Sequence, residues 1–394
     1  MSPWVNPMYD SETLAAVRDQ LERVADGEFY GAKFGDAGVE PGDVDSWEAF
    51  REVPFTTAEE LVADFEADPP EGTLYEGAAM VTFSPMGEGL APVFDTRRDL
   101  AHQAEVNAAV LERAGIEPGD RVVNTFGYEL FGTGYVLHRA LEEVGAEVFP
   151  LGPGDADQTA ATIAEYDIDA YLGNPSFALK LGEEGASVDT VVGAGEPFTS
   201  VPGQREAVKA ALDASTATDY FGTRHIMPVA AETTAEDGLH VVDDYAVVEI
   251  VDPDTGEVLD EGERGEVVVT HVRTEGLPLV RYRTGDLAEL ERRGEDLVMP
   301  DGVIGRTDAR LKIKGVKVYP ESVETVLAGF PGLTGEYRVE VDQPETTDRL
   351  TVVCEGGADE TDLAAALADR LLITPDEVRV IEDLDEGGVV DRRY

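Results

Sequence analysis

Apolar residues recur at helical spacing near the start of the chain. Residues 11–26 carry four of them three and four positions apart, namely Leu14, Val17, Leu21 and Val24. This spacing places them on one face of an amphipathic helix. Residues 59–65 show a second such pattern, and Thr57 precedes it in the position of a helix cap. The N-terminal part of the chain is therefore expected to form helices joined by short connections.

From Ala79 onward the pattern changes to short apolar runs separated by helical segments. The runs cover residues 78–83, 120–126, 145–152, 168–175 and 188–197. Apolar runs that alternate with helices are typical of parallel strands covered on both faces. The pattern therefore predicts an α/β domain.

Two later changes of pattern suggest how the rest of the chain is divided. After Thr234 the apolar runs lengthen and turn residues such as Asp252–Gly256 separate them, which predicts antiparallel strands. The elements expected after Asp308 are a strand at 311–320, a helix opened by Glu321 with Val323, Val326 and Leu327 inside, strands at 337–342 and 349–356, a helix at 360–372 and a strand at 377–384. We expect a large domain over 1–306, β-rich from about 235, and a small α+β domain over 307–394.

The charge balance is extreme, with 30 basic residues against 82 acidic ones and a formal net charge of −52. The acidic residues are spread along the whole chain, so their repulsion would destabilise a compact state in dilute buffer, and molar salt would screen it. This predicts a halophilic protein in a salt-rich cytoplasm. Nucleic acid is not expected as a partner, because the chain has no basic stripe. No run of 18 apolar residues occurs, so no membrane span is expected either.

Cysteine and lysine are both rare. Cys354, the single cysteine, lies in an apolar run and is expected to be buried rather than reactive. Three of the six lysines, Lys312, Lys314 and Lys317, lie within six residues of one another. In a chain that otherwise avoids lysine, this cluster favours contact with an anionic ligand.

Two neighbouring segments carry the most specific pattern: RYRTGDLAEL at 281–290 and GRTDARLKIKGVKVYP at 305–320. Together they resemble two signature motifs of the adenylate-forming enzymes. The resemblance implies that the Asp286 carboxylate accepts both hydroxyls of a ribose and that Arg306 pairs with a phosphate or ribose oxygen. It also implies that Asp308 is the hinge about which a small C-terminal domain rotates.

The resemblance extends over most of the chain and narrows to phenylacetate–CoA ligases and their relatives, including coenzyme F390 synthetase. The similar segments are 54–61, 126–152, 173–181, 193–198 and 239–270. The family implies a large N-terminal domain of α/β subdomains with a β-rich part, followed by a small mobile domain. It also implies ATP and Mg²⁺, coenzyme A as co-substrate, a small carboxylic acid as substrate, and possible homodimers.

The same resemblance assigns site residues. Besides Asp286 and Arg306, the nucleotide contacts would be Ser84, Gly87, Gly89, Gly195, Glu196, Pro197, Phe221, Gly222 and Thr223. An aryl or acyl pocket would be bordered by Phe126, Tyr128, Phe131 and Gly193. The Lys312, Lys314 and Lys317 cluster would meet phosphates or the nucleotide part of coenzyme A.

Three departures from the family pattern bear on catalysis. The phosphate loop at 82–96 lacks the family lysine and contains Glu88, whose charge would cost about 4 kcal/mol at about 4 Å from a phosphate. His225 stands where a glutamate helps to hold Mg²⁺, and imidazole is a poor ligand for that ion. The C-terminal stretch is shortened to Gly387-Gly388 and lacks its lysine. Loss of one such preorganised donor typically lowers the reaction rate by about 10²–10³-fold. No residue is therefore assigned a catalytic role, and no metal ligand is assigned.

Three functions remain open. The first is an ATP-dependent acid–CoA ligase that tolerates these substitutions. The second is a ligase-derived protein that binds a nucleotide or acyl ligand without turnover. The third is adenylyl transfer to a hydroxyl, as in the F390 synthetase relatives. The sequence contains no HExxH, CxxC or GxSxG arrangement that would indicate another enzyme class.

Overall fold

The computed structural model describes residues 9–67, 69, 72, 77–86, 89–307, 311–313, 316–318, 321–342, 349–371, 373–384 and 387–391. The chain divides into two compact units, which are described one at a time. The first consists of Met1–Phe198, Ala207–Thr284 and Ala288–Gly302. The second consists of Thr199–Glu206, Gly285–Leu287 and Val303–Tyr394.

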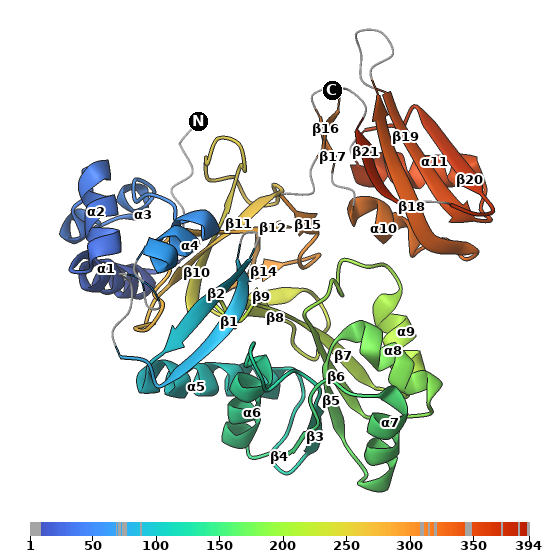
Figure 1. The fold of residues 1–394 in the computed structure, drawn as a ribbon, viewed down its shortest axis with the longest axis horizontal. Helices are drawn as coiled ribbons and strands as arrows, with labels where there is room; N and C mark the ends of the chain where they lie inside the picture. Colours follow the sequence, from blue (N-terminus) through green and yellow to red (C-terminus); the bar gives the residue numbers. More distant parts are fainter. Residues whose placement is uncertain are drawn as a thin grey trace. The chain divides into compact units, whose positions relative to one another are not determined.

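A nine-stranded sheet forms the centre of the first unit, in the order β13-β14-β9-β8-β7-β6-β5-β3-β4 (Figure 1). Its parallel strands are β3 (Arg121–Asn124), β4 (Glu147–Pro150), β5 (Ala170–Gly173), β6 (Thr190–Ala194) and β7 (Thr216–Phe221). Antiparallel strands extend it: β8 (Ala230–Ala231), β9 (Leu239–Val241), β14 (Asp296–Met299) and β13 (Glu291–Arg293).

Helices cover both faces of the parallel strands. One face packs on α5 (Arg97–Arg113) and α6 (Thr133–Val144), and the other on α7 (Ala156–Glu165), α8 (Pro175–Glu183) and α9 (Gln204–Leu212). Neighbouring residues of one strand point to opposite faces: Leu172 of β5 packs with α5 and α6, whereas Tyr171 packs with α7 and α8. Burial on both faces explains the continuous apolar runs, and the predicted α/β fold class is confirmed.

The N-terminal helices are α1 (Ser11–Ala25), α2 (Glu28–Ala37), α3 (Trp47–Phe50) and α4 (Ala58–Ala67), with a short 3₁₀ turn at Pro41–Asp43. Both predicted helices are confirmed. Val17, Leu21 and Val24 are buried along α1. Thr57 caps α4, because its Oγ1 accepts the Glu60 N–H at 3.3 Å while the Glu60 carboxylate accepts the Thr57 N–H at 2.8 Å.

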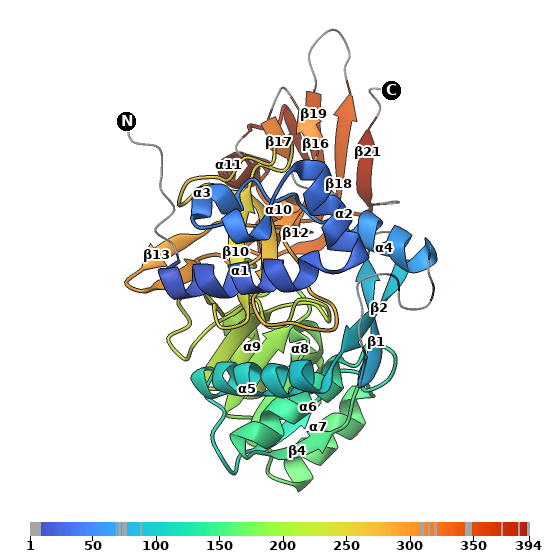
Figure 2. The ribbon, with the colours of Figure 1, turned by 90° about the vertical axis from the view of Figure 1, so that its left-hand side faces the viewer.

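The run at 78–83 does not join the parallel sheet, and that part of the prediction is wrong. It forms β1 (Met80–Met86), which pairs antiparallel with β2 (Gly89–Asp95) in a separate two-stranded sheet. A two-residue connection can join only antiparallel strands, whereas a parallel pair needs a crossover. β2 runs directly into α5 (Figure 2). Thr82, Ser84 and Met86 are buried on one face of β1.

The predicted antiparallel strands after Thr234 include β10 (Ala246–Val251), β11 (Gly265–His271) and β12 (Tyr282–Ala288). The turn predicted at Asp252–Gly256 is present. The Asp252 carboxylate accepts the N–H groups of Asp254 and Thr255, each at 2.9 Å, and the Gly256 N–H bonds the Asp252 carbonyl at 2.8 Å. This closure by an aspartate side chain is the usual function of that residue in a turn.

The second unit contains a mixed four-stranded sheet, β20-β19-β18-β21. Its elements are β15 (Gly305–Arg306), β16 (Leu311–Ile313), β17 (Val316–Val318), α10 (Glu321–Leu327), β18 (Leu333–Asp342), β19 (Arg349–Gly356), α11 (Glu360–Leu371), β20 (Glu377–Ile381) and β21 (Gly388–Asp391). The single strand predicted at 311–320 is wrong, since β16 and β17 are two strands that pair antiparallel with each other. β21 was not predicted.

Two expectations about buried residues hold in the second unit. Val323, Val326 and Leu327 of α10 are buried against the sheet, and Cys354 is fully buried among them. Burial raises the pKa of the Cys354 thiol to about 11, which leaves it protonated and unreactive. Within the part of the chain that the structure describes, no helix is long and apolar enough to cross a bilayer.

Candidate functional site

A stripe of polar residues lies on the buried face of α5. Asp99, Gln103 and Asn107 are four residues apart, so they share one face, and each is almost fully buried. Asp99 caps its own helix together with Thr96 and also accepts the N–H groups of Glu275 at 2.7 Å and Gly276 at 2.8 Å. Asn107 Oδ1 accepts the Tyr220 hydroxyl at 2.6 Å. The helix therefore presents hydrogen-bonding groups to the interior.

Gln103 leads to a buried ion pair between Asp95, the last residue of β2, and Arg224. Asp95 Oδ1 accepts Gln103 Nε2 at 2.8 Å, and Oδ2 accepts Arg224 Nη2. Both side chains are 2% exposed. Burial raises the pKa of the Asp95 carboxyl above its usual value, and the Arg224 charge and the Gln103 bond act against that rise.

The other donors of Arg224 take no part in this pair. Its Nε and Nη1 are buried and have no acceptor among the described residues, and the same holds for the Thr82 hydroxyl. Both side chains lie against Gly132, which precedes α6: a Cβ placed there would lie 2.4 Å from Thr82 Cγ2 and 3.8 Å from Arg224 Nε. Gly132 has φ +64°, and no side chain caps the helix. Only glycine fits this close approach.

His225 lies beside this group. Its Nδ1 is 2.7 Å from Ser84 Oγ and 3.2 Å from Thr223 Oγ1, and its ring meets Tyr282 edge-on at 5.3 Å. Burial, together with the charges of His271 and Arg224, lowers the pKa of His225 to about 3. The imidazole is therefore neutral near pH 7. The structure thus brings together Ser84, Thr223 and His225, which resemblance placed at the phosphate and metal end of a nucleotide site.

A metal centre is not evident around this histidine. A neutral imidazole bonded to a serine lacks the hard oxygen ligands that Mg²⁺ prefers. Two further histidines, the half-buried His102 and the buried His271, flank Tyr245 with ring centroids 6.1 and 5.0 Å from its own. Burial lowers the pKa of each, and that of His271 to about 4. Over the described ranges, no three His, Cys, Asp or Glu side chains are grouped to hold a metal ion.

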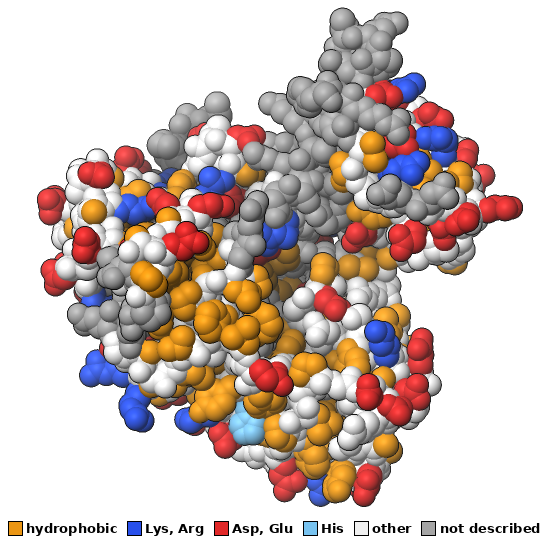
Figure 3. All heavy atoms as spheres, in the orientation of Figure 1, with side chains coloured by type: hydrophobic (Ala, Val, Ile, Leu, Met, Phe, Trp, Pro, Cys, Tyr) orange, Lys and Arg blue, Asp and Glu red, His pale blue; other side chains and the backbone are white. Residues whose placement is uncertain are grey.

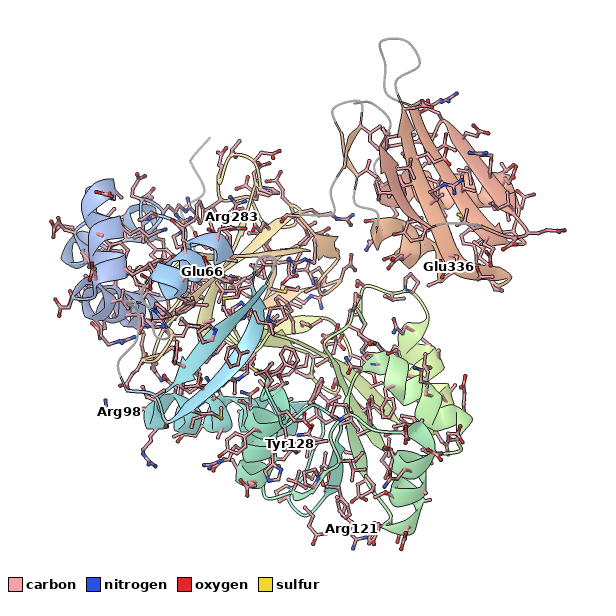
Figure 4. The ribbon with its side chains drawn as sticks, viewed as in Figure 1. Glu66, Arg98, Arg121, Tyr128, Arg283 and Glu336 are labelled. Atoms are coloured by element: carbon pink, nitrogen blue, oxygen red, sulfur yellow. The ribbon has the colours of Figure 1, made fainter. Side chains whose placement is uncertain are left out.

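The expected acyl-pocket residues come from the loop after β3 and from the end of β6. A Cβ placed on Gly195 would lie 3.7 Å from Phe126 Cε1, so these two segments meet. Tyr128 is labelled in Figure 4. Its hydroxyl accepts a hydrogen bond from Asn124 Nδ2 at 3.0 Å and lies 3.2 Å from His138 Nδ1 of α6. Burial raises the pKa of Tyr128 to about 12. Phe131 is 46% exposed, and Gly193 is buried.

The loop that contains Gly195, Glu196 and Pro197 is held by the start of α8. Glu196 accepts the Ser176 backbone N–H at 3.0 Å and its hydroxyl at 2.7 Å. This is the position of a carboxylate at a helix N-terminus, which the helix dipole favours. Phe221 and Gly222 are half-buried at the end of β7, next to Thr223.

The remaining predicted residues belong to the second unit or to the tip of the hairpin. Asp286 and Arg306 pair across β12 and β15, with Arg306 Nη1 donating to Asp286 Oδ1 at 3.0 Å. Gly89 opens β2 opposite Met86. Gly388 opens β21 with φ +95°, directly after Gly387. Three predicted residues lie outside the described part, namely Gly87, Asp308 and Lys314; for Lys312 and Lys317 only the backbone is described.

Sequence reasoning missed the centre of this arrangement: Arg224, Asp95 and Thr82. A usable signal was present at Arg224, a charged residue followed by the apolar stretch Ile226–Ala231. A cation in such a setting is rarely buried without a partner. Its partner is 129 positions away, and nothing in the local pattern identifies it.

The chain is similar in sequence to known proteins. Residues 315–378 match the model of the AMP-binding enzyme C-terminal domain. The phenylacetate-coenzyme A ligase of Thermus thermophilus is 33% identical over 351 residues, which cover 83% of this chain and 76% of that protein. The enzyme of the same name from Escherichia coli is 32% identical over 347 residues, covering 83% and 77%.

Solved structures give the same fold. 2-Hydroxyisobutyryl-CoA ligase, in the postadenylation state with 2-HIB-AMP, matches with a TM-score of 0.83 at 23% identity over 98% of this chain and 90% of its own. An open conformation of that ligase with 2-HIB-AMP and CoA matches with a TM-score of 0.82 at 23% identity, covering 97% and 91%.

Proposed function

We propose, since the chain belongs to the phenylacetate–CoA ligase family of adenylate-forming enzymes, that it activates a carboxylic acid with ATP and transfers the acyl group to coenzyme A. The first step would join the acid to AMP and release pyrophosphate. The second would form the thioester and release AMP. An aryl acid is the substrate class that the relatives' name favours.

The observation that carries this proposal is the contact between the β1–β2 hairpin and the loop after β7. These are the two segments assigned to the phosphates and the metal, and they meet through Ser84–His225 and Asp95–Arg224. Each contact is buried, so the segments are fixed against each other although both sequences depart from the family pattern. These contacts support the proposal because they keep the two segments next to each other.

The candidate residues suit ATP and coenzyme A better than they suit Mg²⁺. By resemblance, Asp286 and Arg306 would hold the ribose and a phosphate, and the Lys312, Lys314 and Lys317 cluster would meet the phosphates of ATP or coenzyme A. Mg²⁺ fits less well, because the neutral His225 supplies no anionic oxygen. We propose that any Mg²⁺ enters on the nucleotide phosphates. We also propose that the small C-terminal domain rotates about Asp308 between the two steps.

Pyrophosphate and AMP release in molar KCl tests the function directly. Purified protein would be given ATP, Mg²⁺, coenzyme A and a panel of aryl and aliphatic acids, with ATP binding measured by calorimetry. Asp286→Asn should weaken ATP binding by about tenfold or more, as expected for loss of a charge-assisted contact. Asp157→Asn, on the exposed first turn of α7, is the control and should leave it unchanged. If the release of pyrophosphate and AMP were the same with every acid of the panel as without acid, the proposal would be refuted.

A second function is favoured by one contact. His225 engages Ser84, a residue expected to contact phosphate, at 2.7 Å. A protein that binds a nucleotide or acyl ligand without turnover would tolerate this arrangement. It would show ATP or acid binding with no pyrophosphate release. Adenylyl transfer to a hydroxyl, the third function, would release pyrophosphate without requiring coenzyme A.

The surroundings in which the protein works are also proposals. The net charge of −52 suits a salt-rich cytoplasm, and stability should rise with KCl concentration as screening removes repulsion.

Hydrophobic side chains gather over the β1–β2 hairpin (Figure 3), where Val81, Leu90, Leu130 and Phe131 are each about half exposed. This face would suit a homodimer, which sedimentation in molar KCl would detect.

A further inference from the structure

We infer that Arg224 and Thr82 bind an uncharged oxygen, a hydroxyl or keto group, on the acyl part of the substrate. The inference rests on the proposed acid-activating function and specifies its substrate class. The acid would differ in that respect from phenylacetate, whose ring and methylene carry no hydrogen-bond acceptor.

The argument begins with donors that the protein leaves without a partner. Arg224 Nε carries one N–H and Nη1 carries two, and none of these has an acceptor within the described ranges. The Thr82 hydroxyl is equally buried and equally without a partner. Buried donors of a charged group are costly when unbonded, so native proteins almost always supply an acceptor. Here the missing acceptor is expected to come from a ligand.

The position of these donors identifies the part of the ligand. Both side chains border Gly132, which directly follows Phe131 in the loop expected to line the acyl pocket. The same loop begins at Phe126, next to Gly195. The start of α6 also lies here without a side-chain cap, and a helix N-terminus favours an oxygen ligand. Arg224 Nε and the Thr82 side chain therefore lie beside the loop that is expected to line the acyl pocket.

Charge decides between a neutral oxygen and a second carboxylate. Asp95 already neutralises Arg224, and Asp99, whose charge also acts on Asp95, adds a further negative charge nearby. His225 is neutral and adds no positive charge. A substrate carboxylate would give this buried region an excess of negative charge, which is costly at low dielectric. A hydroxyl or keto oxygen accepts the same hydrogen bonds without that penalty.

The test compares matched acids by calorimetry in molar KCl, with pyrophosphate release measured on the same samples. Phenylacetate is the parent acid, and the probes are mandelate, phenylglyoxylate and the three ring-hydroxylated phenylacetates. Succinate and phthalate represent a second carboxylate. We expect at least one oxygen-bearing acid to bind about tenfold or more tightly than phenylacetate, the range for a pair of hydrogen bonds to a charged donor.

Two variants connect that preference to the named residues. Thr82→Val removes only the hydroxyl and should reduce the preference for oxygen-bearing acids over phenylacetate about fivefold. The double variant Asp95→Asn/Arg224→Gln replaces the ion pair by two uncharged amides and should abolish most of the preference. Thr218→Val, a buried threonine of β7 outside the site, is the control and should leave the preference intact.

The outcomes separate the inference from the function beneath it. Turnover of phenylacetate without any preference for oxygen-bearing acids overturns the inference and leaves the ligase function standing. Equal losses for both kinds of acid in Thr82→Val overturn it too, because Thr82 and Arg224 would then serve the reacting carboxylate. Tightest binding of succinate or phthalate overturns it in favour of an anion. Absence of acid binding and turnover alike overturns both.

Discussion

Two arginine–carboxylate pairs are buried in the first unit, and they differ in how completely the arginine is used. Arg281 and Glu249 are 3% and 5% exposed, and Arg224 and Asp95 are each 2% exposed. Arg281 donates through Nε and Nη2 to Glu249 and through Nη1 to the carbonyls of Arg51 and Val53. Arg224 donates to Asp95 through Nη2 alone, and its Nε and Nη1 have no acceptor in the described part of the chain.

The difference teaches how to distinguish a structural ion pair from a binding one. Arg281 also lies over the Phe55 ring at 4.1 Å, and its backbone N–H bonds Thr270 Oγ1 at 2.8 Å with φ +44°. Every part of the residue is thus engaged in joining the N-terminal segment to β10 and β11. Burial and pairing alone do not identify a site, because both arginines have them. Buried donors without an acceptor mark Arg224 as the candidate of the two, because native proteins almost always satisfy such groups.

The structural pair should show the largest effect on stability. Arg281→Met leaves the Glu249 carboxylate buried without a partner and removes the two carbonyl contacts, so we expect a loss of about 3–5 kcal/mol. Urea unfolding in molar KCl would measure it. The control is Arg264→Met, whose pair with Glu289 is partly exposed and should matter by less than about 1 kcal/mol. Similar losses in the two variants would contradict the assignment of Arg281 as structural.

Arg224→Gln should cost less, and its cost should depend on pH. Without the arginine charge, the already raised pKa of Asp95 rises further. Below about pH 4, the pKa of an aspartate in the unfolded chain, the Asp95 carboxyl is protonated in both the folded and the unfolded state. The loss of the arginine charge therefore has no effect on stability through Asp95 at that pH. As pH rises, the unfolded chain ionises more readily than the folded one, and the deficit should grow to about 2–3 kcal/mol at pH 7.

The control for this pH dependence is the double variant Asp95→Asn/Arg224→Gln, which has no carboxyl to titrate. The stability deficit of this double variant relative to the parent protein should not grow between pH 4 and 7, in contrast to that of Arg224→Gln. Denaturant midpoints measured across that range in molar KCl would compare the two. A deficit in Arg224→Gln that stays constant with pH would show that Asp95 does not carry the effect.

The contrast also explains what the sequence could predict. The parallel sheet, α1 and the Thr57-capped α4 follow from local spacing, because their apolar residues repeat at the period of the element that they form. The resemblance assigned Asp286 and Arg306 each to a nucleotide, and it did not predict that their side chains bond to each other. Asp95 and Arg224 meet across β2 and the loop after β7, and long-range pairing has no local signature.

The errors have equally physical causes. The run at 78–83 has the composition of a buried strand, and only its two-residue connection to β2 reveals the hairpin. The strand predicted at 311–320 is two antiparallel strands, because Leu311–Ile313 pairs with Val316–Val318. The polar stripe of α5 was not predicted, because Asp99, Gln103 and Asn107 are residue types usually placed on the solvent face of a helix.

Gly132 should respond more than an ordinary glycine at a positive φ. Gly132→Ala would meet Thr82 Cγ2 at 2.4 Å in addition to the cost of φ +64°. Gly185→Ala, at φ +82° with no atom within 4 Å, isolates the backbone cost of about 1 kcal/mol. We expect Gly132→Ala to exceed this control by about 1 kcal/mol in urea unfolding. In a Thr82→Ala background, most of that excess should vanish; if it persisted, the Thr82 methyl would not be its cause.

The smallest effect, Thr82→Val, is the most informative about the binding pair. The Thr82 hydroxyl is buried with no partner over the described residues, so its removal should leave stability unchanged or raise it by up to about 1 kcal/mol. The matched change Thr218→Val removes a hydroxyl that bonds the Val191 carbonyl at 3.4 Å, and it should cost up to about 1 kcal/mol. Thermal unfolding of both variants in molar KCl gives the comparison. A destabilised Thr82→Val protein would mean that the hydroxyl is bonded within the folded chain, and the ligand would then no longer be needed to account for it.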